Sequence, residues 1–153
     1  MEELAPKMQC TFKIYMATTL TLETDIIHIS LIGEVTREDL QDLICKIAEL
    51  EKGLERAPDR LVMISEDVVT LLRYEAIEEF AAKRNELCYK NSVKTAMVAR
   101  RPLQVGYSRM IQSLNSNPQI KIEIFSTKDA ALSWLKAAVD RPIFRSETLL
   151  ASF

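Results

Sequence analysis

A predicted strand that runs directly into a capped helix, between residues 25 and 53, constrains the fold more than any other feature of the sequence. The apolar run Ile26–Ile32 predicts a buried strand, and Gly33 predicts a tight exit from it. Thr36 is a good N-cap for the following helix, Asp39 stands in the place of a capping-box acid, and Gly53 marks the helix end. One such unit cannot bury both faces of a sheet, so the rest of the chain should repeat it.

Further strands are indicated by two kinds of apolar pattern. Residues 61–64 are wholly apolar, and residues 95–99 are apolar apart from Thr95, which favours central strands covered on both faces. Residues 11–16 and 120–125 alternate between apolar and polar side chains, which favours the two edges of the sheet. The segment 18–24 is predicted to turn the chain between the first strand and the second, and so short a connection favours an antiparallel pair.

Three more helices complete the pattern. Helical periodicity is established by Tyr74, with Asn91 as the expected end of that helix. Pro102 suits the first turn of the next helix, and Thr127 is the expected N-cap of the last one. The predicted order is β-β-α-β-α-β-α-β-α. The sequence therefore predicts an α/β fold: a single domain with a mixed, mostly parallel five-stranded sheet and about four helices.

A chain of 153 residues fits one domain, which we assign to residues 11–139. Residues 1–10 are expected to be a lead-in. Residues 140–153 form an apolar tail that should be covered by its own domain or by a second subunit, and we expect a homodimer to which the tail contributes contact area.

Charge and cysteine content narrow the classes of function. The net charge of −2 gives no overall positive field, so nucleic-acid binding is not expected. The three cysteines are far apart and form no CxxC pair, which indicates free thiols in a reducing cytoplasm. No apolar run approaches the length of about 20 residues that spans a bilayer, so no membrane insertion is expected.

Catalytic and cofactor-binding patterns are missing from the sequence. The single histidine, His28, falls in the middle of a predicted strand, and with three glycines neither a dinucleotide fingerprint nor a phosphate-binding loop can be written. No His or Cys stands beside the acid pairs to complete a metal site. Cys45 and Cys88 are interpreted as packing residues. We therefore expect no enzyme, no cofactor and no metal.

A candidate surface for a ligand or partner follows from topology. Ligands of parallel sheets tend to lie beyond the carboxyl ends of the strands. Arg100 and Arg101 precede a predicted helix N-terminus and could hold a phosphate or a partner's carboxylate, although a solvated arginine pair is the simpler interpretation. The residues predicted at these strand ends are Gly33, Glu34, Ser65, Glu66, Asp67, Thr70, Arg100, Arg101, Ser126 and Thr127.

Three local patterns, together with the order of elements, resemble a known family. They are the hairpin leading into ISLIGEVTREDLQDL, the strand TAMVA, and the ending IEIFSTKDAALSWL. The chain resembles the STAS superfamily over about residues 11–139, and more closely its SpoIIAA-like branch, which is similar to the sporulation anti-sigma-factor antagonist. The resemblance implies a non-enzymatic interaction or regulatory module. The alternative is a small-molecule binding protein, with an apolar cavity between sheet and helices or an anion near Arg100.

The chain departs from the signalling members of this family at one step. Those members carry an Asp-Ser-Ser-Gly-type sequence at the start of the second helix, where a partner kinase phosphorylates a serine. The corresponding residues here, 65–73, read SEDVVTLLR. Ser65 and Thr70 are the only hydroxyl groups there, beside Glu66 and Asp67, whose negative charge would repel a phosphate. We expect that phosphorylation is not the switch.

Overall fold

A five-stranded mixed sheet forms the centre of the computed structural model, which describes residues 18–70 and 72–140. The strand order is β1-β2-β4-β6-β7. The edge strand β1 is antiparallel to β2, and the other neighbours are parallel. The strands span Thr18–Glu23 (β1), Ile26–Leu31 (β2), Asp59–Ile64 (β4), Val93–Val98 (β6) and Ile120–Phe125 (β7).

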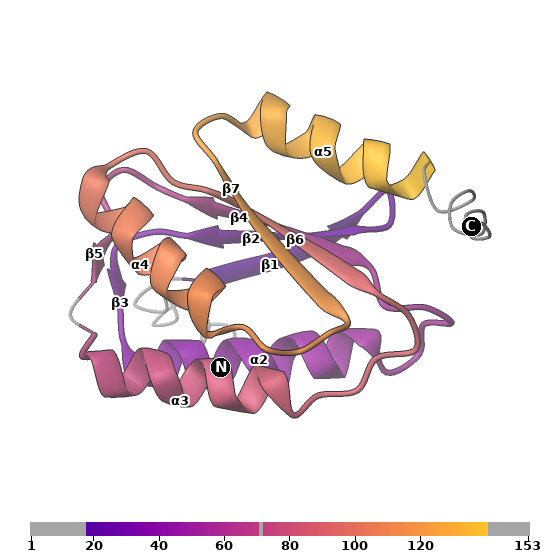
Figure 1. Ribbon diagram of the computed structural model, residues 1–153, viewed down its shortest axis with the longest axis horizontal. Coiled ribbons are helices and arrows are strands. Elements are labelled where there is room, and N and C mark those ends of the chain that lie inside the picture. Colours follow the sequence, from indigo (N-terminus) through magenta and orange to yellow (C-terminus); the bar gives the residue numbers. More distant parts are fainter. Residues whose placement is uncertain (1–17, 71, 141–153) are drawn as a thin grey trace, which may run out of the picture.

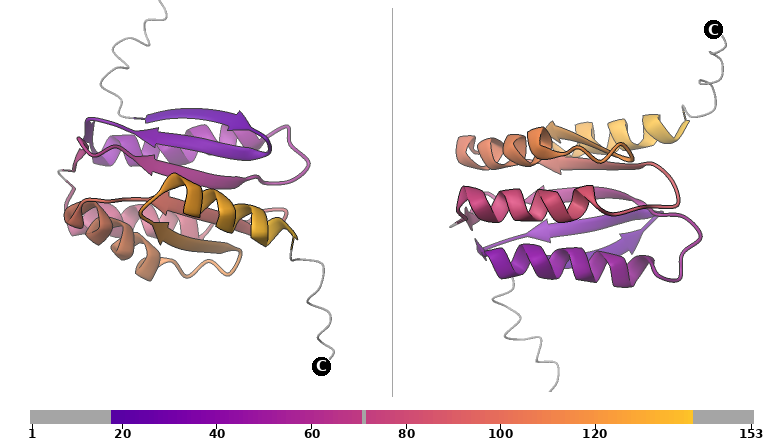
Figure 2. Two further views of the ribbon diagram at one scale, coloured as in Figure 1. Left: turned by 90° about the horizontal axis from the view of Figure 1, so that it is seen from above. Right: turned by 60° about the horizontal axis from the view of Figure 1, so that its bottom comes forward.

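Within the described residues, four helices cover the two faces of this sheet unequally (Figures 1 and 2). Helices α2, α3 and α4 each connect two parallel strands and lie on one face, as same-handed crossovers in one direction require. Helix α5 lies on the opposite face, where it packs on β4, β6 and β7. The helices span Arg37–Glu51 (α2), Tyr74–Asn85 (α3), Pro102–Leu114 (α4) and Lys128–Asp140 (α5).

Local sequence signals account for the helix starts. Thr36 and Asp39 form a complete capping box: the Asp39 amide donates to Thr36 Oγ1 over 3.2 Å, and the Thr36 amide donates to Asp39 Oδ2 over 2.9 Å. Pro102 occupies the first turn of α4. Thr127 Oγ1 accepts a hydrogen bond from the amide of Ala130 over 3.2 Å at the start of α5. All three starts agree with the sequence prediction.

Alternation along the strands divides the core into two layers. Ile27, Ile29, Val62 and Met97 belong to the layer beneath α2, α3 and α4. The residues between them face α5 and form the second layer. That second layer consists of Ile26, Leu61, Ala96, Val98, Ala131 and Leu135.

The predicted fold class and element order are confirmed. Residues 61–64 belong to the central strand β4 and residues 95–98 to the interior strand β6, while residues 120–125 form an edge. Both interior strands begin two residues earlier than predicted.

One prediction at the first edge is wrong. Residues 18–23 form strand β1 and not a turn, since Leu20 and Leu22 alternate with threonines and pair with Ile29 and Ile27. The turn itself is shorter than predicted: Thr24 and Asp25 adopt φ values of 48° and 65°, which suit a two-residue hairpin. The strand predicted at residues 11–16 lies outside the described residues, as does the tail 141–153.

Two further differences concern the loops. Helix α3 ends at Asn85 and not at Asn91. The amides of Glu86 and Leu87 donate to the carbonyl oxygens of Lys83 and Arg84 over 3.3 Å and 3.2 Å, which closes the helix with a tighter last turn. A short parallel pair, β3 (Glu34–Val35) with β5 (Val69–Thr70), was not predicted from sequence. Two-residue strands carry too little periodicity to be recognised.

Candidate functional site

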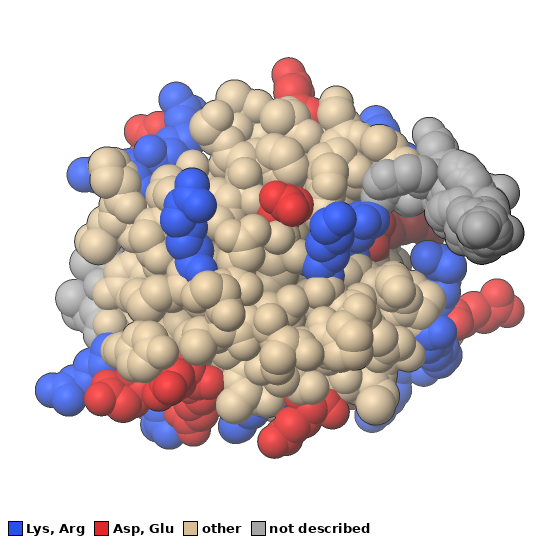
Figure 3. All heavy atoms as spheres, viewed as in Figure 1, with Lys and Arg blue, Asp and Glu red and all other residues tan. Residues whose placement is uncertain are grey.

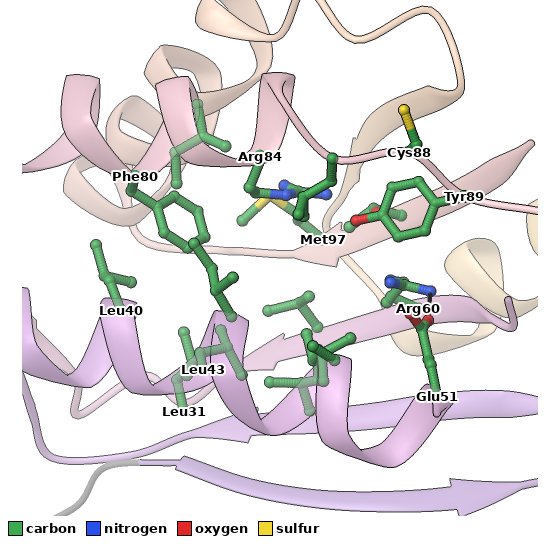
Figure 4. Close-up of a pocket in the computed structure, with 18 of the residues that line it drawn as sticks. Leu31, Leu40, Leu43, Glu51, Arg60, Phe80, Arg84, Cys88, Tyr89 and Met97 are labelled. Carbon is green, nitrogen blue, oxygen red and sulfur yellow. Dashed lines mark ion pairs between the residues drawn. The ribbon is translucent and has the colours of Figure 1, made fainter. Parts of the chain in front are cut away.

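A cavity of about 310 Å³ lies between the sheet and helices α2 and α3 (Figure 4). Its floor comes from β2, β4 and β6, and its walls come from α2, α3 and the segment that follows α3. The lining residues are Ile29, Leu31, Leu40, Leu43, Ile44, Ile47, Ala48, Glu51, Lys52, Arg60, Val62, Phe80, Arg84, Leu87, Cys88, Tyr89, Lys90, Thr95, Met97 and Ile111.

One end of the cavity is apolar. Leu40 and Leu43 project from α2, Phe80 projects from α3, and Leu31 comes from the end of β2 (Figure 4). Leucine and isoleucine side chains of α2 thus line this space as well as the core. When a hydrocarbon group binds against such a lining, apolar surface on both sides is removed from water. This burial is the dominant favourable contribution to the free energy of binding.

The other end of the cavity is polar and is organised around Arg60. Its side chain is 3% exposed and forms an ion pair with Glu51 of α2, with Nη1 and Oε2 2.6 Å apart. Arg60 also donates to the carbonyl oxygen of Pro58 and stacks on the ring of Tyr89, 5.2 Å from its centroid. A buried arginine needs such partners, because an unpaired charge away from water costs several kcal/mol, on the order of 3–5.

A second cation, Arg84, enters the same end from α3. Figure 4 shows its guanidinium group pointing toward the Tyr89 hydroxyl. Loss of water around the guanidinium lowers the pKa of Arg84, the positive charge of Arg60 lowers it further, and the Tyr89 side chain opposes both effects. The group stays protonated at neutral pH. No Asp or Glu within residues 18–70 and 72–140 forms an ion pair with Arg84.

Thr95 contributes an unused hydroxyl group to this end of the cavity. It stands on β6 directly opposite Arg60 of β4 in the register of the sheet, and it is 4% exposed. Its Oγ1 has no hydrogen-bond partner among the described residues. A buried hydroxyl without a partner costs about 1–3 kcal/mol, so each such group requires an explanation.

Side-chain amides from the loop before β7 hold Arg84 and Tyr89 in place. Asn117 Nδ2 donates to the carbonyl oxygens of Arg84 and Leu87, each over 2.9 Å, at the end of α3, where the Leu87 amide also donates to the Arg84 carbonyl oxygen over 3.2 Å. Gln119 binds both backbone groups of Tyr89, accepting over 2.8 Å and donating over 2.7 Å. The polar end of the cavity therefore has a fixed geometry.

The loops at the carboxyl ends of β4 and β6 meet. Ser65 Oγ donates to Asp67 Oδ1 over 2.6 Å, and Arg100 Nε lies 3.3 Å from Glu66 Oε2. Arg101 donates to the carbonyl oxygen of Glu66 over 2.9 Å. The two arginines are thus engaged with the 65–67 loop, so an anion would have to compete with Glu66 for Arg100.

The remaining predicted surface residues occupy separate places. Gly33 has a φ of 71°, which favours glycine, and Glu34 begins β3. Thr70 ends β5, beside β3. Ser126 and Thr127 follow β7, and Thr127 is occupied as a helix cap. A ligand or partner at this surface stays a prediction.

The other candidates for chemistry have structural surroundings. His28 is half-buried, with Nε2 3.8 Å from Glu23 Oε1 across the hairpin. Cys45 and Cys88 are exposed, so their interpretation as packing residues was wrong, although Cys88 borders the cavity. Within the described ranges, no group of three or more His, Cys, Asp or Glu side chains could hold a metal ion.

Sequence reasoning missed the polar end of the cavity. Arg60 precedes the apolar run of β4 and falls in phase with the inward-facing Val62. Arg84 shares a face of α3 with Ile77 and Phe80, and no local pattern explains a charge there. A cation in phase with buried positions was the available signal, because it needs a buried partner.

The charges of this site are local and not part of a larger field. On the face shown in Figure 3, basic and acidic side chains are interspersed and form no continuous patch of one sign. Among the residues that the structure describes, no helix is both long and apolar enough to cross a bilayer.

A solved structure supports the fold assigned here. A crystal structure of an uncharacterised DUF3478-family protein with a SpoIIAA-like fold, from Shewanella loihica PV-4, aligns with a TM-score of 0.50 and 18% sequence identity. The alignment covers 78% of this chain and 92% of that one. No protein-family model matches the sequence, and no curated protein matches it. At this level of identity the likeness concerns the fold alone: the chain has the SpoIIAA-like α/β fold.

Proposed function

We propose that this protein binds a small apolar molecule in the cavity between its sheet and helices α2 and α3. The cavity itself supports the proposal: about 310 Å³ of space with a mainly apolar lining falls within the range of ligand sites in proteins, roughly 300–1,000 Å³. A small-molecule binding protein was the second alternative from sequence. The geometry of the described residues favours it over the first.

The role proposed is binding without catalysis, in the cytoplasm. The polar groups that line the cavity are two arginines, two lysines, one glutamate, a tyrosine, a threonine and the thiol of Cys88, and this lining contains no histidine that could act as a general base for the thiol. Cys45 and Cys88 are free and exposed, which suits a reducing compartment.

An uncharged fluorescent probe, N-phenyl-1-naphthylamine, tests the proposal. Ala48 lies at the exposed edge of the cavity lining on α2, so Ala48→Trp should place an indole ring in the opening. Ala82 is an exposed alanine on α3 outside the lining, so Ala82→Trp is a matched control. We expect saturable binding to the wild type, at least tenfold weaker binding to Ala48→Trp, and unchanged binding to Ala82→Trp.

Two results would contradict the proposal. One is a wild-type protein, folded by circular dichroism, that does not bind the probe. The other is an equal loss of binding in both tryptophan variants, which would place the probe elsewhere. Native mass spectrometry of protein purified from its own host would then show whether any ligand is carried.

The second candidate function is a regulatory module that binds a protein partner or itself. Exposed apolar side chains near the contacting loops after β4 and β6 favour it. Ile32 is 50% exposed before Gly33, and Leu103 is 66% exposed at the start of α4. Light scattering on the full chain, on Leu103→Glu and on a chain without residues 141–153 tests self-association. A homodimer lost in either variant supports this candidate, and a full-length monomer contradicts the predicted homodimer.

A further inference from the structure

We infer that the cavity ligand carries a carboxylate group, which Arg84 and Thr95 bind at the polar end while the hydrocarbon part occupies the apolar end. This inference rests on the proposed function and names its ligand class. The cavity volume of about 310 Å³ lies at the small end of the range for ligand sites and suits a ligand of modest size. The ligand class is an amphipathic monocarboxylate of medium chain length.

The balance of charge at the polar end is the first argument. Arg60 has Glu51 as its counter-ion, 2.6 Å away. Arg84 has the Tyr89 side chain beside it and forms no ion pair within the described ranges. The cavity lining thus contains four cationic side chains, the other two being Lys52 and Lys90, against the single carboxylate of Glu51, and a monoanion bound at Arg84 would reduce this excess of positive charge.

Unused hydrogen-bonding capacity is the second argument. Thr95 Oγ1 is buried and has no partner in the described part of the chain. A hydroxyl donates one hydrogen bond and a guanidinium group donates five, whereas an ionised carboxylate only accepts. A carboxylate at this end would satisfy both groups at once, and charge-assisted hydrogen bonds of this kind are the strong ones.

The position of Arg84 along the cavity is the third argument. Its guanidinium carbon lies 5.8 Å from the centroid of the Phe80 ring, which belongs to the apolar end. Figure 4 shows the same guanidinium directed toward Tyr89 at the polar end. Arg84 therefore stands where a head group would meet its chain. An alcohol would leave the arginine without a counter-ion, and an amine would repel it.

Binding of three ten-carbon probes to the wild-type protein tests the inference by isothermal titration calorimetry. At pH 7.5 and below the micelle concentrations, we expect decanoate to bind at least tenfold more tightly than decanol, and decylamine to bind least. The tenfold difference corresponds to about 1.4 kcal/mol, the low end of what hydrogen bonds to a charged group contribute. Equal affinities for decanoate and decanol would overturn the inference and leave the proposed function standing.

Substitutions at Arg84 and Thr95 test whether these two side chains cause the preference for decanoate. Arg84→Gln should weaken decanoate about tenfold or more and decanol less than threefold, whereas Arg84→Lys should retain a preference for decanoate. Thr95→Val should weaken decanoate alone, by about threefold to tenfold. Arg109→Gln, at an exposed arginine on α4 outside the lining, is the matched control and should change neither affinity.

The variants remain informative if a substitution damages the fold. Binding of N-phenyl-1-naphthylamine reports an intact cavity independently of the head group. If Arg84→Gln no longer binds the neutral probe, its cavity is damaged, and the Arg84→Lys and Thr95→Val variants then test the role of these residues in binding the carboxylate. Retained decanoate preference in Arg84→Gln with an intact cavity, or an equal loss in Arg109→Gln, contradicts the assignment. Failure of every probe, decanol and the naphthylamine included, contradicts the proposed function itself.

Discussion

The two faces of the sheet are built differently, although the same five strands supply both. Helix α5 approaches β4, β6 and β7 closely, and its contact residue Ala131 is small, as is Ala96 on the sheet. Helices α2 and α3 keep their backbones further from the sheet and meet it through Leu40, Leu43 and Phe80. One face is therefore closely packed, and the other encloses the cavity.

Side-chain size accounts for this difference. An alanine on a helix lets the backbone settle on the strands, and interiors packed in this way have few voids. Large side chains on α2 and α3 hold those helices away from the sheet. Two large side chains that face the cavity, Arg60 of β4 and Arg84 of α3, are charged. Their polar partners hold them in place, so they do not move to fill the remaining space.

The largest expected effect comes from truncating one leucine on each face. Leu135 on the α5 face is 0% exposed, so Leu135→Ala should lower the free energy of unfolding by about 3–5 kcal/mol. Leu43 is also buried but already borders empty space, so Leu43→Ala should cost less, about 2–3 kcal/mol. Urea unfolding at 25 °C measures both. The reverse order would contradict the difference between the faces.

A polar substitution tests the pair that fixes the polar end of the cavity. Glu51→Gln leaves the buried charge of Arg60 without a counter-ion, so we expect a loss of about 3 kcal/mol in the free energy of unfolding. Glu79→Gln is the control, because Glu79 pairs with Arg37 on an exposed surface between α2 and α3. Its loss should be too small to resolve by urea unfolding. Equal effects of the two substitutions would indicate that the inner pair is solvated.

The opposite change, enlarging a side chain, should also destabilise the protein more on the α5 face than on the cavity face. Ala131→Leu forces three more carbons into the closely packed layer and should cost about 1–3 kcal/mol. Val62→Leu adds one carbon facing the cavity and should cost less than about 1 kcal/mol. Thermal unfolding of both variants provides the measurement. If Val62→Leu is the more damaging of the two, the cavity is smaller than described.

The smallest expected effect depends on pH. Burial raises the pKa of Asp59, at the start of β4, above its ordinary 3.8, against the opposing hydrogen bond from the Lys94 amide. Because folding raises this pKa, the protonated carboxyl group favours the folded state. Its contribution to the free energy of unfolding is complete below pH 3.8 and is lost as the pH rises through the folded-state pKa. Asp59→Asn should therefore be slightly more stable than the wild type at pH 7.

The pH series supplies its own control. The advantage of Asp59→Asn should shrink as the pH is lowered toward 3.8, since the wild-type carboxyl group then becomes neutral as well. Urea unfolding of both proteins between pH 3.5 and about pH 7 measures the difference. A variant that is less stable than the wild type at pH 7 and level with it at low pH would reverse the sign of the shift.

The sequence predicted the architecture because its signals were local. The capping box at Thr36, the proline at Pro102 and the unbroken apolar runs of the central strands each determine the structure of a few neighbouring residues. Strand β1 was missed, although Leu20 and Leu22 alternate, because the segment before it alternates too. Period-two alternation shows that a strand exists but does not choose between adjacent candidates.

The candidate site was predicted poorly because it depends on distances between elements. Glu51, Arg60 and Arg84 come from α2, β4 and α3, and nothing local in the sequence brings them together. A cavity is a difference between the volume enclosed and the volume filled, so neither periodicity nor composition reveals it. The loops after β4 and β6, which carry several of the predicted surface residues, do contact each other, because parallel strands place their carboxyl ends at one edge of the sheet.

The most direct test of the account follows the methyl groups of both faces by NMR while decanol is added. Ile29, Leu43 and Val62 line the cavity. Leu61 and Val98 face α5 on the other side of the sheet, and Leu135 projects from α5 onto them. Binding in the cavity predicts saturable chemical-shift changes in the first three residues and unchanged positions in the other three. Shifts confined to the α5 face, or no saturable shifts in either set, would contradict the claim that this protein holds an apolar ligand beneath α2 and α3.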